Sequence, residues 1–184
     1  MLILITGAAR NGKSKYAVEL AARYHKKCLL VTSQALDNKV KIRIHNHQKE
    51  NNKSFATHKA PVHLASALLN LQNQFELILI DSLHSWMSNL LVQYMNVSED
   101  TIQQEVEWFL QALQSTKADV IMVTQETSAP RNHEDASALR LNQELRRVNQ
   151  KVAELSSEVF FMIGGVPNEI KKSILDDADV EIEA

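Results

Sequence analysis

Short apolar runs recur along the chain, and stretches of mixed polarity separate them. Each run has the length of a strand and is almost continuously apolar, which is typical of strands buried on both faces. The predicted strands span residues 2–6, 28–32, 77–81, 119–124 and 158–163. The segments between them are long enough for crossover helices, predicted over residues 13–24, 38–49, 63–71, 82–92, 101–115 and 136–155. Because strands and helices alternate, the sequence predicts an α/β fold of three layers with a mainly parallel sheet.

The interruptions of this pattern add loops and caps. Ser98 is the predicted N-cap of the helix over residues 101–115, and two acidic residues follow it at favourable positions of the first turn. Residues 48–54 and 128–135 lack apolar periodicity and are predicted as surface loops, which in α/β proteins often line a ligand. No segment reads as a linker, so residues 1–184 are expected to form one domain with a flexible acidic tail at residues 176–184.

Composition narrows the function classes. The 184 residues are 45% hydrophobic and 23% charged, enough for one sizeable core, and the formal net charge of −2 provides no overall basic surface. Cys28 is the only cysteine, so an internal disulfide framework is excluded and core packing is its expected role. No apolar run reaches the roughly 18 residues that a membrane span requires. The expected protein is therefore cytoplasmic, without a nucleic acid partner and without a membrane span.

A phosphate-binding motif stands between the first predicted strand and the first predicted helix. The pattern G-x-x-x-x-G-K-[ST] is complete in Gly7-Ala8-Ala9-Arg10-Asn11-Gly12-Lys13-Ser14. Its glycines let the loop curl until backbone N–H groups face a phosphate, and the helix N-terminus adds a positive dipole end. Lys13 is expected to reach the β- and γ-phosphates of ATP or GTP, and Ser14 to ligate Mg²⁺. Arg10 either contacts a phosphate or points to solvent. The sequence thus predicts a P-loop NTPase-like fold.

Two carboxylates stand at or just beyond strand ends and are candidates for the phosphate site. Asp81 closes the strand over residues 77–81, where it would hold the metal ion or its water. The alternative for Asp81 is a helix N-cap, since Ser82 and a predicted helix follow. Glu126 lies beyond the strand over residues 119–124, and it either orients metal-bound water or substrate, or caps a helix or loop.

Several stretches form a pattern that is more specific than the phosphate loop. They are residues 4–14, 32–34, 43–47, 81–91, 123–126 and 148–150. Two of them are distinctive, Arg-Ile-x-x-His at residues 43–47 and Asp-x-Leu-x-x-Trp-x-x-Asn-Leu-Leu at residues 81–91. In order and spacing, over most of the chain, they resemble the adenosylcobinamide kinase / adenosylcobinamide-phosphate guanylyltransferase family of cobalamin biosynthesis.

This resemblance implies a homo-oligomeric enzyme, expected as a trimer, that carries out two reactions. The first moves the γ-phosphate of ATP or GTP to the hydroxyl of the aminopropanol arm of adenosylcobinamide. The second moves GMP from GTP to the resulting phosphate and releases pyrophosphate. The resemblance also implies that a guanylylated His47 is the intermediate of the second reaction. Further nucleotide contacts are implied for Thr32, Ser33, Gln34 and Asp81.

The chemistry of His47 suits this role but does not require it. A neutral imidazole is nucleophilic near pH 7, and its attack on the α-phosphorus would divide one transfer into two displacements. The alternative is a solvated histidine at a helix end. Metal ligation by His45 and His47 is not favoured, because a spacing of two residues puts them on different faces of a helix and no Cys or acidic cluster completes a site.

Some positions depart from the family's pattern. Lys59 stands where an acid is expected to help hold the guanosine part, and Asn51 stands where a phosphate-contacting arginine is expected. The segment over residues 127–146, expected near the corrinoid, keeps little of the pattern. Three arginines near it are either replacement phosphate contacts or the charged face of a helix: Arg140, Arg146 and Arg147. Either the corrinoid contacts have been rebuilt, or guanylyl transfer has been lost or changed.

Two other functions stay open alongside the bifunctional enzyme. One is a P-loop kinase for another small hydroxyl substrate. The other is a nucleotide-gated binding protein that switches a partner surface without turning over a small molecule. The preference between ATP and GTP is open as well.

Overall fold

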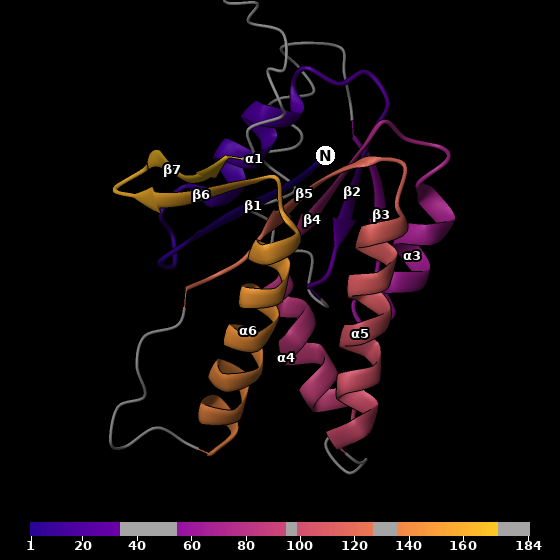
Figure 1. Ribbon diagram of the computed structural model, residues 1–184, viewed down its shortest axis with the longest axis vertical. Coiled ribbons are helices and arrows are strands. Elements are labelled where there is room, and N and C mark those ends of the chain that lie inside the picture. The colour runs from indigo at the N-terminus through magenta and orange to yellow at the C-terminus, as the bar shows by residue number, and fades with distance from the viewer. Residues whose placement is uncertain (34–54, 95–98, 127–135, 173–184) are drawn as a thin grey trace, which may run out of the picture.

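The computed structural model describes residues 1–33, 55–94, 99–126 and 136–172, which form a sheet covered by helices (Figure 1). The sheet has 7 strands in the order β3-β2-β4-β5-β1-β6-β7. All neighbouring strands are parallel except β6 and β7, which form an antiparallel hairpin at one edge. The strands are β1 (Leu2–Gly7), β2 (Lys27–Val31), β3 (Ala56–Lys59), β4 (Leu77–Asp81), β5 (Asp119–Val123), β6 (Glu158–Ile163) and β7 (Val166–Lys172). The helices are α1 (Lys13–Ala21), α3 (Leu64–Leu71), α4 (Leu83–Gln93), α5 (Glu99–Ser115) and α6 (Ala136–Leu155).

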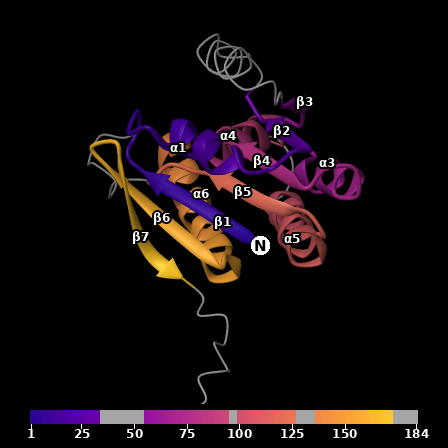
Figure 2. The same ribbon diagram turned by 90° about the horizontal axis from the view of Figure 1, so that it is seen from above.

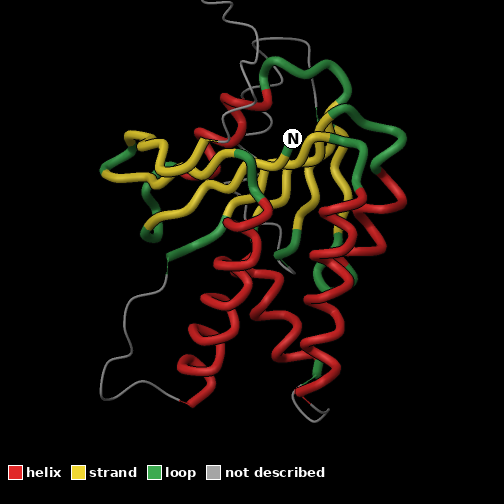
Figure 3. The backbone as a smooth tube through the Cα atoms, in the orientation of Figure 1, coloured by secondary structure: helices red, strands yellow, loops and turns green. Residues whose placement is uncertain are grey.

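Side chains of the strands alternate between two cores, one on each face of the sheet. On one face, α1 packs on a core that includes Ile3 and Ile5. On the other face, α3, α4, α5 and α6 cover a larger core that includes Leu4 and the buried Trp86. Figure 2 shows α1 and the pair of α5 and α6 on opposite sides of the sheet, and Figure 3 shows the long helices extending away from it. Because both faces are covered, the central strands are apolar at nearly every position.

The predicted α/β class and mainly parallel sheet are confirmed, and all five predicted strands are present. The apolar pattern does not predict β3 and β7, which lie at the two edges of the sheet. Their sequences, Ala-Thr-His-Lys and Val-Pro-Asn-Glu-Ile-Lys-Lys, are mostly exposed and contain no apolar run. An edge strand pairs on one side only and tolerates proline and charge, so its sequence carries little of the pattern of a buried strand.

Some element boundaries differ from the predicted ones. α1 ends at Ala21 rather than at residue 24. The buried Lys27 binds the chain at this end: its Nζ donates to the carbonyl oxygen of Ala21, the last residue of the helix, at 3.4 Å, and to that of Tyr24, beyond the helix, at 3.3 Å. α5 begins at Glu99 rather than at residue 101. Several predictions fall outside the described residues: the helix over residues 38–49, the loops over 48–54 and 128–135, the Ser98 cap and the tail over 176–184.

Two predictions from composition can be compared with the described residues. Cys28 lies in the larger core, and burial raises the pKa of its thiol to about 11. A thiol held protonated in this way is a poor nucleophile, so core packing is its role. In the part of the chain that the structure describes, no helix is long and apolar enough to cross a membrane.

Candidate active site

The loop between β1 and α1 has the curled backbone that its glycines were expected to allow. Positive φ angles occur at Gly7 (137°), Arg10 (63°) and Gly12 (83°). Gly7 also permits a close approach, since a Cβ atom built on it would lie 2.8 Å from the backbone oxygen of Met162 in β6. Asn11 Nδ2 donates to that same oxygen at 3.2 Å. The loop is thus held against β6 at the carboxyl edge of the sheet, directly before the N-terminus of α1.

Lys13, the first residue of α1, is folded back onto this loop and is only 9% exposed. Its Nζ donates to the carbonyl oxygens of Gly7 at 2.9 Å and Ala8 at 2.5 Å. Burial lowers the pKa of Lys13 below its ordinary value, and the nearby charge of Asp81 partly opposes this shift. A phosphate in the loop would offer charged oxygens in place of neutral carbonyls, so that donor and acceptor would both be ionised and would attract each other more strongly. Lys13 Nζ therefore lies at the loop, where the motif predicts a contact with phosphate.

Asp81 ends β4, which is separated from β1 by β5 alone. It lies in register with Val31 of β2 and with Val123 of β5. Ser82 is the N-cap of α4, and its side chain accepts a hydrogen bond from the backbone N–H of Ser85 at 3.3 Å. The N-cap alternative for Asp81 is therefore wrong. Its carboxylate acts electrostatically on the loop lysine, so it lies near the phosphate loop.

Thr32, a predicted nucleotide contact, is buried and is engaged with the start of α4. Its Oγ1 donates to the carbonyl oxygen of Ser82 at 2.7 Å and accepts from the N–H of Ser82 at 2.8 Å. Asn89 Nδ2 donates to the carbonyl oxygen of Thr32 at 2.6 Å. Thr32 thus joins the end of β2 to α4, and half-buried Ser33 follows it. Nucleotide contacts from both residues stay predictions. Two other predicted site residues lie outside the described residues: Gln34 and His47.

His84 is a neighbour of the phosphate loop that no sequence motif predicts as a site residue. It lies in the first turn of α4. Burial lowers the pKa of His84 below its ordinary value of 6.5, and the charge of Lys13 lowers it further. A neutral imidazole therefore lies close to the loop lysine. The only sequence signal for it is its place one turn after a strand that ends in aspartate.

Glu126 also reaches the phosphate loop. Its backbone N–H donates to the carbonyl oxygen of Gly7 at 3.1 Å, and its Oε2 accepts from the Thr6 hydroxyl at 3.4 Å. The side chain of Thr6 is buried, whereas Glu126 is exposed. The structure thus brings together three residues at the ends of neighbouring strands. Asp81 ends β4, Glu126 follows β5, and Lys13 begins the helix that follows β1.

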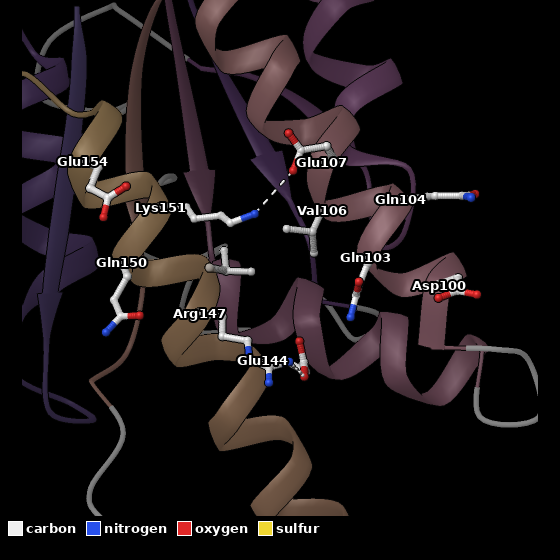
Figure 4. A pocket seen from close by; sticks show the side chains of 11 residues that line it. Asp100, Gln103, Gln104, Val106, Glu107, Glu144, Arg147, Gln150, Lys151 and Glu154 are labelled. Carbon is white, nitrogen blue, oxygen red and sulfur yellow. Dashed lines mark hydrogen bonds and ion pairs between the residues drawn. The ribbon is translucent and has the colours of Figure 1, made fainter.

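A cavity of about 790 Å³ lies between α5 and α6, on the face of the sheet opposite α1 (Figure 4). Most of the residues that line it carry polar or charged side chains, and two are valines. Arg147 lines it and pairs with Glu144 at 2.8 Å, while Lys151 pairs with Glu107 across it at 3.4 Å. No residue of the phosphate loop lines this cavity. For Arg147, the structure therefore favours the charged helix face over a phosphate contact.

One family model matches most of the chain. The model described as "Cobinamide kinase / cobinamide phosphate guanyltransferase" matches residues 3–170. The bifunctional adenosylcobalamin biosynthesis protein CobU of Escherichia coli is 29% identical over 181 residues, which cover 93% of this chain and 100% of that protein. The bifunctional adenosylcobalamin biosynthesis protein CobP of Pseudomonas aeruginosa is 29% identical over 169 residues, which cover 91% of this chain and 96% of that protein.

Solved structures match the fold at low sequence identity. An ATPase from the type III secretion system of pathogenic bacteria superimposes with a TM-score of 0.55 at 11% identity, covering 87% of this chain and 51% of that chain. A protein of Pyrococcus horikoshii also gives a TM-score of 0.55, at 5% identity, covering 95% of this chain and 87% of that one. These likenesses concern the fold alone, and they agree with the expected α/β class.

Proposed function

Since the chain belongs to the cobinamide kinase / cobinamide phosphate guanyltransferase family, we propose how its residues serve the two reactions of that family. The chain is a bifunctional enzyme of cobalamin biosynthesis, a cobinamide kinase and a cobinamide-phosphate guanylyltransferase. The observation that carries this function is the family match over residues 3–170, which includes the complete phosphate loop with Lys13 folded into it. Of the three functions that the sequence left open, the match supports this one.

The phosphate loop holds the nucleoside triphosphate in both reactions. During phosphoryl transfer Lys13 contacts the β- and γ-phosphates, where its charge offsets the negative charge that develops. Mg²⁺ fits the residues present, because Ser14 and Asp81 offer oxygen ligands and this ion is commonly held by one or two carboxylates together with substrate phosphates. When bound, it would neutralise phosphate charge. Among the described residues, no group of three or more His, Cys, Asp or Glu side chains is gathered to hold a metal.

His47 is the nucleophile of guanylyl transfer in this proposal. A ring nitrogen attacks the α-phosphorus of GTP, the bond to pyrophosphate breaks, and the phosphate of cobinamide phosphate then displaces the histidine. The support is the Arg-Ile-x-x-His stretch at residues 43–47, which lies inside the matched range.

The acceptor is expected to be a corrinoid of the adenosylcobinamide type. The enzyme is expected to be a homo-oligomer, and the family resemblance implies a trimer. Light scattering after size-exclusion chromatography measures the subunit count directly. A monomer at assay concentrations that is fully active would contradict the oligomer.

Intact-mass spectrometry after incubation with GTP and Mg²⁺ tests the role of His47. The expected product is an acid-labile adduct of one GMP, present in the wild type and absent in His47→Ala. His45→Ala is the matched control, because it removes the neighbouring imidazole and is expected to keep the adduct. An adduct that persists in His47→Ala, or disappears only in His45→Ala, would assign the nucleophile elsewhere.

A further inference from the structure

The end of β5 lies between the phosphate loop and Asp81. Val123 in β5 is in register with Ile5 of β1 on one side and with Asp81 of β4 on the other. Neighbouring strands are about 4.8 Å apart. The residues that follow Val123 therefore leave the sheet in the space between the lysine of the loop and the carboxylate of Asp81. The γ-phosphate of a bound nucleotide is expected over this same space.

Hydrogen bonds hold the chain after β5 on two sides. Thr124 Oγ1 donates to Asn149 Oδ1 of α6 at 2.7 Å, and Asn149 Nδ2 donates to the carbonyl oxygen of Gln125 at 3.1 Å. On the other side, the N–H of Glu126 bonds the Gly7 carbonyl oxygen at 3.1 Å, and this oxygen also accepts from the loop lysine at 2.9 Å. The backbone of Glu126 is therefore fixed to the first residue of the loop.

The carboxylate of Glu126 is positioned but accessible. The Thr6 hydroxyl donates to its Oε2 at 3.4 Å, while the residue as a whole is exposed. Asp81 raises the pKa of Lys13, and the charge of Lys13 lowers the pKa of His84, so both residues lie near the loop lysine. Glu126 follows β5 and is exposed, whereas Lys13 is buried in the loop.

The two reactions of this enzyme differ in what they require from a base. In the kinase reaction the acceptor is an alcohol, which must lose its proton while its oxygen bonds to phosphorus. In guanylyl transfer the nucleophiles are a neutral imidazole and a phosphate, and neither depends on removal of a hydroxyl proton. A general base is therefore needed by the kinase reaction alone.

We propose that Glu126 is the general base of the kinase reaction, a role that rests on the proposed function. The O–H bond of the acceptor alcohol breaks, its oxygen forms a bond to the γ-phosphorus, and the bond from that phosphorus to the bridging β,γ-oxygen breaks. The nucleoside diphosphate leaves, and the proton passes to a carboxylate oxygen of Glu126 and then to water. Thr6 is a positioning residue that orients this carboxylate.

Separate assays of the two reactions on the full-length enzyme test the proposal. In Glu126→Gln, kcat for phosphorylation of cobinamide is expected to fall by about 100-fold or more, the usual contribution of a general base, with little change in KM for the nucleotide. Transfer of GMP to preformed cobinamide phosphate is expected to persist at a wild-type rate. Glu126→Asp should recover part of the kinase rate. Glu107→Gln is the matched control, because it makes the same change at an exposed carboxylate on α5.

Other outcomes separate the proposal from its premise. An unchanged kinase kcat in Glu126→Gln would overturn the role of Glu126 as base. Equal losses in both reactions would overturn it as well, since they would indicate a shared effect on nucleotide binding or folding. A wild-type enzyme that phosphorylates no cobinamide would instead refute the proposed function.

Discussion

Replacing Gly7 with alanine tests the contact between the phosphate loop and β6. The new Cβ atom would lie 2.8 Å from the backbone oxygen of Met162, 3.2 Å from its nitrogen and 3.3 Å from its Cβ. The two residues are paired in the β1–β6 ladder, so the neighbour can move only by disturbing that ladder. Overpacking of this kind costs about 1–3 kcal/mol. The φ of 137° adds strain of about 1–3 kcal/mol for a residue with a side chain.

The expected destabilisation of Gly7→Ala is therefore about 2–6 kcal/mol, the sum of both terms. Gly165→Ala is the matched control, because Gly165 has a φ of 87° with no atom within 4 Å of the added Cβ. Only the strain of about 1–3 kcal/mol applies there. Urea unfolding followed by circular dichroism measures both variants, and a shared slope permits comparison of the midpoints. If Gly7→Ala loses no more stability than Gly165→Ala, the close approach of Gly7 to β6 contributes nothing to the difference in the free energy of unfolding, which would refute the packing argument.

Three further changes have defined outcomes. The pKa of His84 is lowered in the folded protein, first by burial and then by the charge of Lys13, so the unfolded chain binds the proton more readily. The contribution of His84 to the free energy of unfolding is therefore fully present above about pH 6.5 and is lost as the pH falls below it. Urea midpoints of wild type and His84→Asn should therefore converge on acidification, and parallel curves would contradict the shift. Lys27→Met removes an ammonium that donates to the carbonyl oxygens of Ala21 and Tyr24 and lies 5.2 Å from the Phe55 ring centroid, so the free energy of unfolding should fall by about 1–3 kcal/mol. A stability equal to wild type in thermal unfolding would show that the buried ammonium is not needed. Lys59→Glu restores the acid of the family's pattern, and the ratio of kcat/KM for GTP to that for ATP should rise; a ratio that stays constant would remove Lys59 from nucleotide selection.

The predictability of the fold depended on where a strand lies in the sheet. β4 reads Leu-Ile-Leu-Ile-Asp and is buried at its four apolar positions, so its sequence alone predicts a central strand. β3 and β7 carry exposed polar residues at the sheet edges, where no apolar run is required. The β-propensity of their residues does not predict these two strands, because pairing with an inner strand decides their conformation.

The candidate site was predictable where one short segment contains the whole signal. The phosphate loop places its glycines, Lys13 and Ser14 within eight consecutive residues, so a sequence pattern can represent it. The approach of Glu126 to Gly7 spans more than a hundred residues, and it exists because β5 inserts between β4 and β1. Strand order is a tertiary property, so a spacing pattern could mark Glu126 as following a strand but could not say which loop it would meet.

The stretch over residues 81–91, one of the two distinctive stretches of the family resemblance, makes contacts that explain two of its residues. Trp86 is buried and its Nε1 donates to the carbonyl oxygen of Val62 at 2.6 Å. Asn89 Nδ2 donates to the carbonyl oxygens of Thr32 at 2.6 Å and Pro61 at 3.0 Å. One helix thus satisfies backbone groups where both β2 and β3 leave the sheet, at the edge where ligands of parallel α/β proteins bind. Trp86 and Asn89 are three residues apart in α4, so they share one face of the helix and both reach these exits. These contacts order the carboxyl edge of the sheet, the edge at which the phosphate loop also lies.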